Sequence, residues 1–185
     1  MKAIAFDGPN KESLHDVPAY EIRNPETTLE IPVFSDVHGD IKGLFRAISA
    51  LQKLNKRHYP IVLVTGDLGF FPYLTDLDPE QVAREIRSEK NRGINQYFRT
   101  DEIYRQYFVE PKGFGKLIAK VFFVRGNHED QDDLMSFRRS KITTPVNPND
   151  QHEILWYIPD GILFQIRAGS GESLTISALG KRSNG

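Results

Sequence analysis

The stretch that decides the fold is Ser35-Asp36-Val37-His38-Gly39-Asp40, which follows the apolar run Ile31-Pro32-Val33-Phe34. Side chains at positions i and i+2 of an extended chain point the same way, so Asp36 and His38 are expected to converge on one point. Gly39 lets the backbone turn sharply beside them. A carboxylate oxygen beside an imidazole suits a divalent transition metal such as Mn, Fe or Zn. The alternative is a strand end whose aspartate caps the next helix and whose histidine lies on the surface.

Two further apolar runs of β-forming residues also end in polar side chains. Residues 61–65 are followed at once by Gly66 and Asp67. Residues 121–124 are followed, after one arginine, by Gly126-Asn127-His128-Glu129. Ligands of open α/β sheets bind at the carboxyl ends of the strands. We therefore expect the three runs to deliver their polar residues to one edge of a sheet.

Between the first two runs, apolar residues recur at the spacing of an amphipathic helix. These residues are Ile41, Leu44, Phe45, Ile48, Leu51 and Leu54. The predicted helix ends near Asn55, and the order strand, helix, strand predicts a right-handed βαβ unit. Further strands are predicted near both ends of the chain. Residues 2–6 predict an edge strand, and the runs 154–158, 162–166, 169–172 and 174–178 predict a meander.

Composition limits the class of protein. The chain has 185 residues, which suggests one domain, and its net charge of -1 gives no field that would mark a nucleic-acid or membrane partner. It has no cysteine, so any metal must be bound by His, Asp, Glu or Asn. No apolar run reaches the ~18 residues of a membrane span, and the first residues lack the apolar region of a signal peptide. A cytoplasmic location is the default expectation.

Asp-x-His-Gly, then Gly-Asp, then Gly-Asn-His-Glu, in this order, resembles the calcineurin-like metallophosphoesterases over about residues 31–180. The resemblance implies an α/β fold in which a β-sandwich of two sheets is flanked by helices, with residues 157–161 and 177–180 in the second sheet. It implies one metallophosphoesterase domain over residues 1–185, incomplete at its C-terminus, that corresponds to the N-terminal two-thirds, roughly, of the family fold. Residues 69–115 are expected to form a helical insert or cap.

The resemblance also implies a role for each polar residue at the strand ends. Asp36 and His38 would hold a first metal ion. Asp67 would bridge two ions, and Asn127 would bind the second one. His128 would bind no metal and would donate a proton to the leaving oxygen. The cofactors would be two divalent metal ions (Mn, Fe, Zn or similar), which clamp a phosphate and activate a water.

The implied function is metal-dependent hydrolysis of a phosphomonoester or phosphodiester. The implied substrate is a phosphorylated small molecule, a nucleotide or a nucleic acid, with no membrane partner. The run Gly66-Asp67-Leu68-Gly69 lacks the Asp-Arg continuation of the protein Ser/Thr phosphatases, which argues for another branch. The family's later Gly-His-x-His element is missing, since His152 is the only histidine after His128. We therefore expect a truncated, weakly active form. The alternative is a non-catalytic binding or scaffold module on the same fold.

Two features leave alternatives open. Basic and aromatic side chains are interleaved between residues 84 and 120. They form either a cap that grips phosphates and stacks on bases or a helical pair whose aromatic residues, Tyr107 and Phe108 among them, face the core. Glu129 either orients His128 or begins the helix that follows it.

Overall fold

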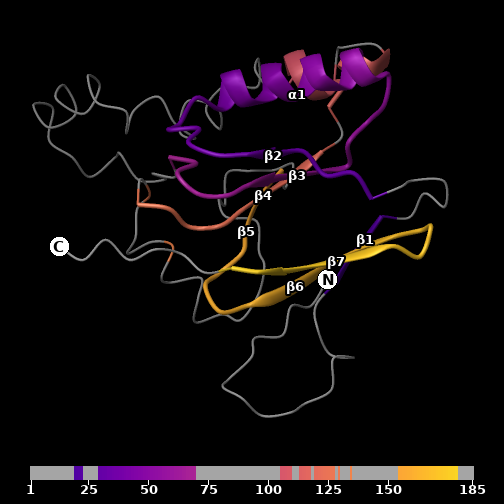
Figure 1. The fold of residues 1–185 in the computed structure, drawn as a ribbon. Helices are drawn as coiled ribbons and strands as arrows, with labels where there is room; N and C mark the ends of the chain where they lie inside the picture. The colour runs from indigo at the N-terminus through magenta and orange to yellow at the C-terminus, as the bar shows by residue number, and fades with distance from the viewer. Residues whose placement is uncertain are drawn as a thin grey trace, which may run out of the picture.

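Two β-sheets and one long helix make up most of the chain that the structure describes (Figure 1). The structure is a computed structural model. It describes residues 19–22, 29–69, 105–109, 113–117, 119–127, 129, 134 and 154–178. The described part is a mixed α/β fold with one sheet of four strands and one of three. This confirms the predicted fold class.

The first sheet is parallel throughout and has the strand order β2-β3-β4-β5. Its strands are β2 (Val33–Phe34), β3 (Ile61–Val64), β4 (Lys120–Phe123) and β5 (Leu155–Tyr157). β3 and β4 are buried along most of their length, as expected of strands that are covered on both faces. The βαβ prediction is therefore confirmed, and the carboxyl ends of β2, β3 and β4 lie at one edge.

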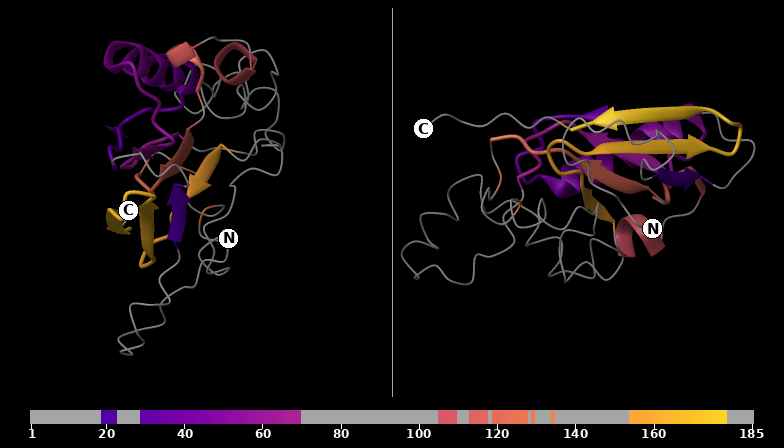
Figure 2. Two further views of the ribbon diagram at one scale, coloured as in Figure 1. Left: turned by 90° about the vertical axis from the view of Figure 1, so that its right-hand side faces the viewer. Right: turned by 90° about the horizontal axis from the view of Figure 1, so that it is seen from below.

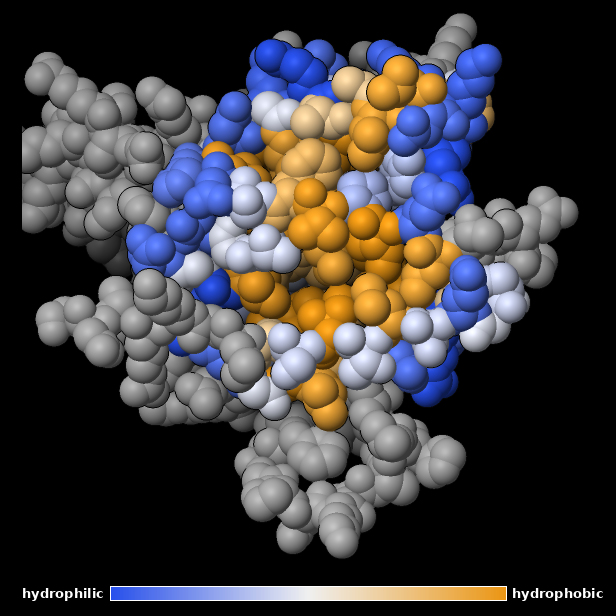
Figure 3. Space-filling model, in the orientation of Figure 1, coloured by the Kyte–Doolittle hydropathy of each residue, from blue (hydrophilic) through white to orange (hydrophobic). Residues whose placement is uncertain are grey.

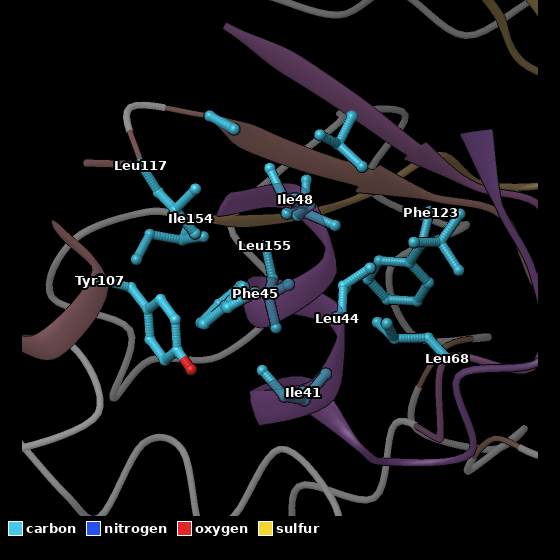
Figure 4. Packing of buried hydrophobic residues seen from close by; sticks show 14 of the residues in the cluster. Ile41, Leu44, Phe45, Ile48, Leu68, Tyr107, Leu117, Phe123, Ile154 and Leu155 are labelled. Atoms are coloured by element: carbon cyan, nitrogen blue, oxygen red, sulfur yellow. The ribbon is translucent and has the colours of Figure 1, made fainter. Parts of the chain in front are cut away.

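Helix α1 (Ile41–Asn55) connects β2 to β3 and covers one face of the first sheet (Figures 1 and 4). It begins where the Asp40 carboxylate accepts the N–H of Gly43 at 2.8 Å. It ends where Lys56 adopts a left-handed conformation with φ 50°. Both ends agree with the sequence prediction.

A second element packs on the same helix. Tyr107 and Phe108 lie in η3 (Arg105–Val109), a π-helical turn, and both are buried. Their ring centroids lie 5.9 and 5.2 Å from that of Phe45 in α1. These two aromatic residues therefore face the core and are not free to stack on bases. The short 3₁₀ turn η4 (Gly113–Gly115) also belongs to the expected insert, most of which lies outside the described residues.

The second sheet has the strand order β1-β6-β7 and forms a separate layer (Figure 2). Its strands are β1 (Ala19–Ile22), β6 (Leu163–Ala168) and β7 (Ser173–Ser177). β6 and β7 form an antiparallel hairpin, and β1 runs parallel to β6. Phe122 of β4 joins the layers, because its ring centroid lies 5.0 Å from that of Phe164 in β6.

Some strand predictions are wrong. β5 belongs to the first sheet, where it pairs with β4, and not to a meander with the later strands. Its residues are all buried, which fits a strand covered on both faces and not one with a solvent face. Residues 157–161 therefore end β5 and turn towards β6 instead of lying in the second sheet. Residues 169–172 form the β6–β7 turn, in which Gly171 has φ 91°.

The N-terminal prediction is not tested. The expected edge strand at residues 2–6 lies outside the described residues. β1, which pairs with β6 at the edge of the second sheet, was not predicted from the sequence.

Apolar side chains also reach the surface of the two sheets. In the orientation of Figure 1, they gather over the face that carries β2 and the β6–β7 hairpin (Figure 3). Val33 of β2 and Leu174 of β7 are among the exposed large apolar residues. Among the described residues, no helix has both the length and the apolar character needed to cross a membrane.

Phe122→Ala should destabilise the fold by about 3–5 kcal/mol, because it empties a fully buried site between the two sheets. Leu54→Ala is the control, since Leu54 is 79% exposed and should shift the free energy of unfolding by less than about 0.5 kcal/mol. Urea unfolding of both variants measures the difference. Equal effects of the two substitutions would contradict the packing described here.

Candidate metal centre

The loops that follow β2, β3 and β4 meet at the carboxyl edge of the first sheet. Asp36 and His38 follow β2, and Asp67 follows β3. Each of these residues offers one ligand atom, and the three atoms lie within 4.8 Å of one another. His38 Nε2 lies 3.9 Å from an oxygen of Asp36. The structure thus brings together three of the four predicted ligands.

The chemistry of this cluster fits a divalent cation. Two carboxylates and one imidazole provide oxygen and nitrogen donors, which suit Mn, Fe or Zn. The side chains of Asp36 and His38 are 67% and 30% exposed. An ion held here would keep positions for water or substrate, as catalytic metal sites require.

The backbone of the site departs from the geometry expected from the sequence. Asp36, His38 and Asp67 have φ of 52°, 47° and 51°, in the left-handed region. Among the described residues, Lys56 at the helix end is the only other non-glycine residue with positive φ. The side chains of Asp36 and His38 therefore converge because the chain turns, and not because they alternate along an extended strand. Strained backbone of this kind clusters at functional sites.

Three backbone hydrogen bonds tie the first loop to the second. The N–H of Asp36 donates to the carbonyl of Gly66 at 3.3 Å. The N–H of His38 donates to the carbonyl of Asp67 at 2.8 Å, and the N–H of Gly39 to that of Leu68 at 2.8 Å. This ladder fixes the two ligand-bearing loops against each other.

Two glycines allow the loops to approach so closely. A Cβ added to Gly69, whose φ is 83°, would lie 2.3 Å from the nitrogen of Gly39. A Cβ added to Gly126 would lie 2.0 Å from Asp67 Oδ1. Any side chain at either position would push a ligand-bearing loop away from its neighbour.

Asn127 lies beside Asp67. Its backbone N–H donates to Asp67 Oδ1 at 2.7 Å, so the third loop contacts the aspartate directly. The role of the Asn127 side chain as a ligand stays a prediction. His128, the predicted proton donor, lies outside the described residues.

Glu129 has a position that neither sequence alternative anticipated. Its side chain is buried, and its two oxygens accept the backbone N–H groups of Leu68 at 2.7 Å and Gly126 at 2.9 Å. Burial raises the pKa of Glu129, these hydrogen bonds oppose the rise, and the nearby Asp67 adds to it. Through these two hydrogen bonds the Glu129 carboxylate joins the loop after β3 to the loop after β4.

A buried ion pair connects the third loop to the turn after β5. Arg125 Nη2 donates to Asp160 Oδ2 at 2.5 Å, and both side chains are largely buried. Asp160 lies in the turn after β5. This pair could not be predicted from the sequence, because nothing local links residues on different loops.

A family model of calcineurin-like phosphoesterases matches residues 29–167, well over half of the chain. The chain belongs to the calcineurin-like phosphoesterase family. No curated protein and no solved structure matches it significantly.

Membership of the calcineurin-like phosphoesterases indicates metal-dependent hydrolysis of phosphoesters. The matched residues include every predicted ligand and both glycines at the loop contacts. The family and the Asp36, His38 and Asp67 cluster together favour a divalent metal centre.

Gly69→Ala should destabilise the fold and disturb the centre, whereas Gly171→Ala should only destabilise it. Both glycines have positive φ, so alanine costs about 1–3 kcal/mol of strain at either position. At Gly69 the added Cβ would meet the backbone of Gly39, which adds about 1–3 kcal/mol of steric cost. At Gly171 nothing lies within 4 Å of the added Cβ.

Urea unfolding and manganese titration of the two variants test this difference. Loss of manganese affinity in Gly69→Ala alone is expected. An equal loss in Gly171→Ala would show that general destabilisation, and not the loop contact, controls the site.

Proposed function

We propose that this chain hydrolyses phosphomonoesters or phosphodiesters at a centre of two divalent metal ions. The observation that carries the proposal is the convergence of Asp36, His38 and Asp67 at one sheet edge in a calcineurin-like phosphoesterase. Ions held there supply the charge that binds a phosphoryl group and the acidity that activates water.

In this proposal each residue of the chain has a distinct task. Asp36 and His38 hold the first ion. Asp67 would contribute to holding both ions, because a carboxylate has two oxygens to offer. Asn127 holds the second ion through its side-chain oxygen, and His128 donates a proton to the leaving oxygen.

The carboxylates also explain why metal is needed for substrate binding. Asp36 and Asp67 place two carboxylates at the edge where a phosphoester would bind. A phosphate would be repelled by this edge unless cations neutralised it. Substrates in this proposal are phosphorylated small molecules, nucleotides or nucleic acids.

Two sequence features define the proposal further. After Gly66-Asp67 the chain continues with Leu68-Gly69, which supports a branch other than the protein Ser/Thr phosphatases. Leu68 is fully buried and Gly69 packs on Gly39, so these positions serve packing of the loops. We further propose manganese as a working metal and a cytoplasmic location.

A non-catalytic binding module is the second candidate. It is favoured by the scarcity of histidines, since His152 is the only one after His128. Few ligands for two ions imply weak metal binding or slow hydrolysis. This candidate shares the metal site and differs only in turnover.

Asp67→Asn should abolish manganese binding and hydrolysis together, because the amide loses the charge and one acceptor oxygen at the bridging position. Calorimetric titration with manganese and hydrolysis of bis(p-nitrophenyl) phosphate and p-nitrophenyl phosphate measure the two effects. Glu21→Gln is the control, since this exposed residue pairs with Arg167 on the second sheet. Full metal binding by Asp67→Asn would refute the site. Metal binding by the wild type without turnover would favour the binding module.

His128→Ala should lower turnover about 10²–10⁴-fold while manganese affinity stays unchanged. A proton donor acts in the transition state and holds no ion, so kcat falls more than substrate binding does. Steady-state kinetics under saturating manganese give kcat, and calorimetry gives the affinity. An unchanged kcat would remove His128 from the mechanism.

A further inference from the structure

Glu129 is a charged side chain in an unusual place. It is only 4% exposed, although carboxylates are rarely buried without a specific reason. It follows the predicted ligand Asn127 by two positions. A buried polar side chain needs hydrogen-bond partners, so the contacts of Glu129 should show what holds it there.

The contacts of Glu129 are divided between the two loops that carry predicted ligands. Oε1 accepts the N–H of Leu68, the residue next to Asp67, at 2.7 Å. Oε2 accepts the N–H of Gly126, the residue next to Asn127, at 2.9 Å. Hydrogen bonds from N–H groups to a carboxylate are stronger than those between neutral groups. The Glu129 side chain thus holds the backbone next to Asp67 and the backbone next to Asn127.

The two loops that Glu129 connects pack closely against each other. Gly126 has no room for a Cβ against Asp67, and the N–H of Asn127 reaches Asp67 Oδ1 at 2.7 Å. A small shift of either loop therefore changes the direction in which Asp67 presents its oxygens. Partners of this kind, one shell away from a metal, orient the ligands and tune affinity.

We propose that Glu129 is the positioning residue of the centre, which holds Asp67 and Asn127 in register through the amides of Leu68 and Gly126. The proposal rests on the proposed function, since it assigns these two residues to the metal ions. It differs from both sequence alternatives for Glu129, which stay predictions because His128 and residues 130–133 lie outside the described residues.

Glu129→Gln tests the proposal with the least change in shape. Its carboxamide has one acceptor oxygen, so its NH₂ group must face one of the two N–H donors. We expect manganese affinity to fall about 10–100-fold in the folded full chain. Calorimetric titration measures the affinity, and circular dichroism confirms the fold. Glu21→Gln makes the same chemical change at an exposed site and should bind manganese like the wild type.

A second readout separates positioning from simple loss of stability. If Glu129 acts through the ligands, saturating manganese should restore the hydrolysis rate of Glu129→Gln towards that of the wild type. A stability defect would lower the folded fraction and leave the affinity of the folded chain unchanged. Unchanged affinity in folded Glu129→Gln overturns the proposal.

Two outcomes remain to be distinguished. If Glu129→Gln does not fold, Glu129→Asp keeps the charge but shortens the reach, and the same titration applies. Weaker manganese binding by folded Glu129→Asp supports the proposal, and wild-type affinity overturns it.

If the wild type itself binds no manganese, the proposed function fails and this inference falls with it. Wild-type binding with an unaltered Glu129→Gln refutes the inference alone.

Discussion

The backbone ladder between residues 36–39 and 66–68 is the constraint on which the site depends. Its hydrogen bonds bind the loop after β2 to the loop after β3, so His38 and Asp67 cannot separate without breaking them. Left-handed backbone at non-glycine residues costs about 1–3 kcal/mol each, and the structure carries it at Asp36, His38 and Asp67. The parallel sheet supplies the rigid frame, and the ladder offsets part of that cost. Strain here is the consequence of bringing three side chains to one point.

Much of the fold could be predicted because its signals are local. The apolar spacing of α1 and the capping residue Asp40 determine where the helix begins, and both are visible in the sequence. Continuous apolar runs likewise predicted β3 and β4. β5 was assigned to the wrong sheet, because a strand's partners depend on long-range pairing that its own residues do not encode. β1 was missed for the same reason, since it is a short strand whose partner, β6, lies far along the chain.

The candidate site was predictable in its residues but not in its geometry. Motif order placed Asp36, His38 and Asp67 at one sheet edge, and the structure brings them together. Asp36 and His38 are neighbours, as their i and i+2 spacing predicted, but left-handed backbone and not strand alternation directs their side chains. The contacts of Glu129 could not be foreseen, since its partners lie on another loop and are backbone amides that any sequence would provide.

The charges at this edge indicate how folding and metal binding are coupled. Asp36 and Asp67 converge within a few ångströms, and the buried Glu129 feels the charge of Asp67. Backbone N–H groups stabilise Glu129 and one oxygen of Asp67, but they are dipoles and cannot cancel the net charge. A cation at the cluster would remove the repulsion that remains. An ion that bound only the folded arrangement would stabilise it, so metal binding and the packing of these loops would be coupled. The close loop packing around Gly69 and Gly126 therefore holds the carboxylates near one another.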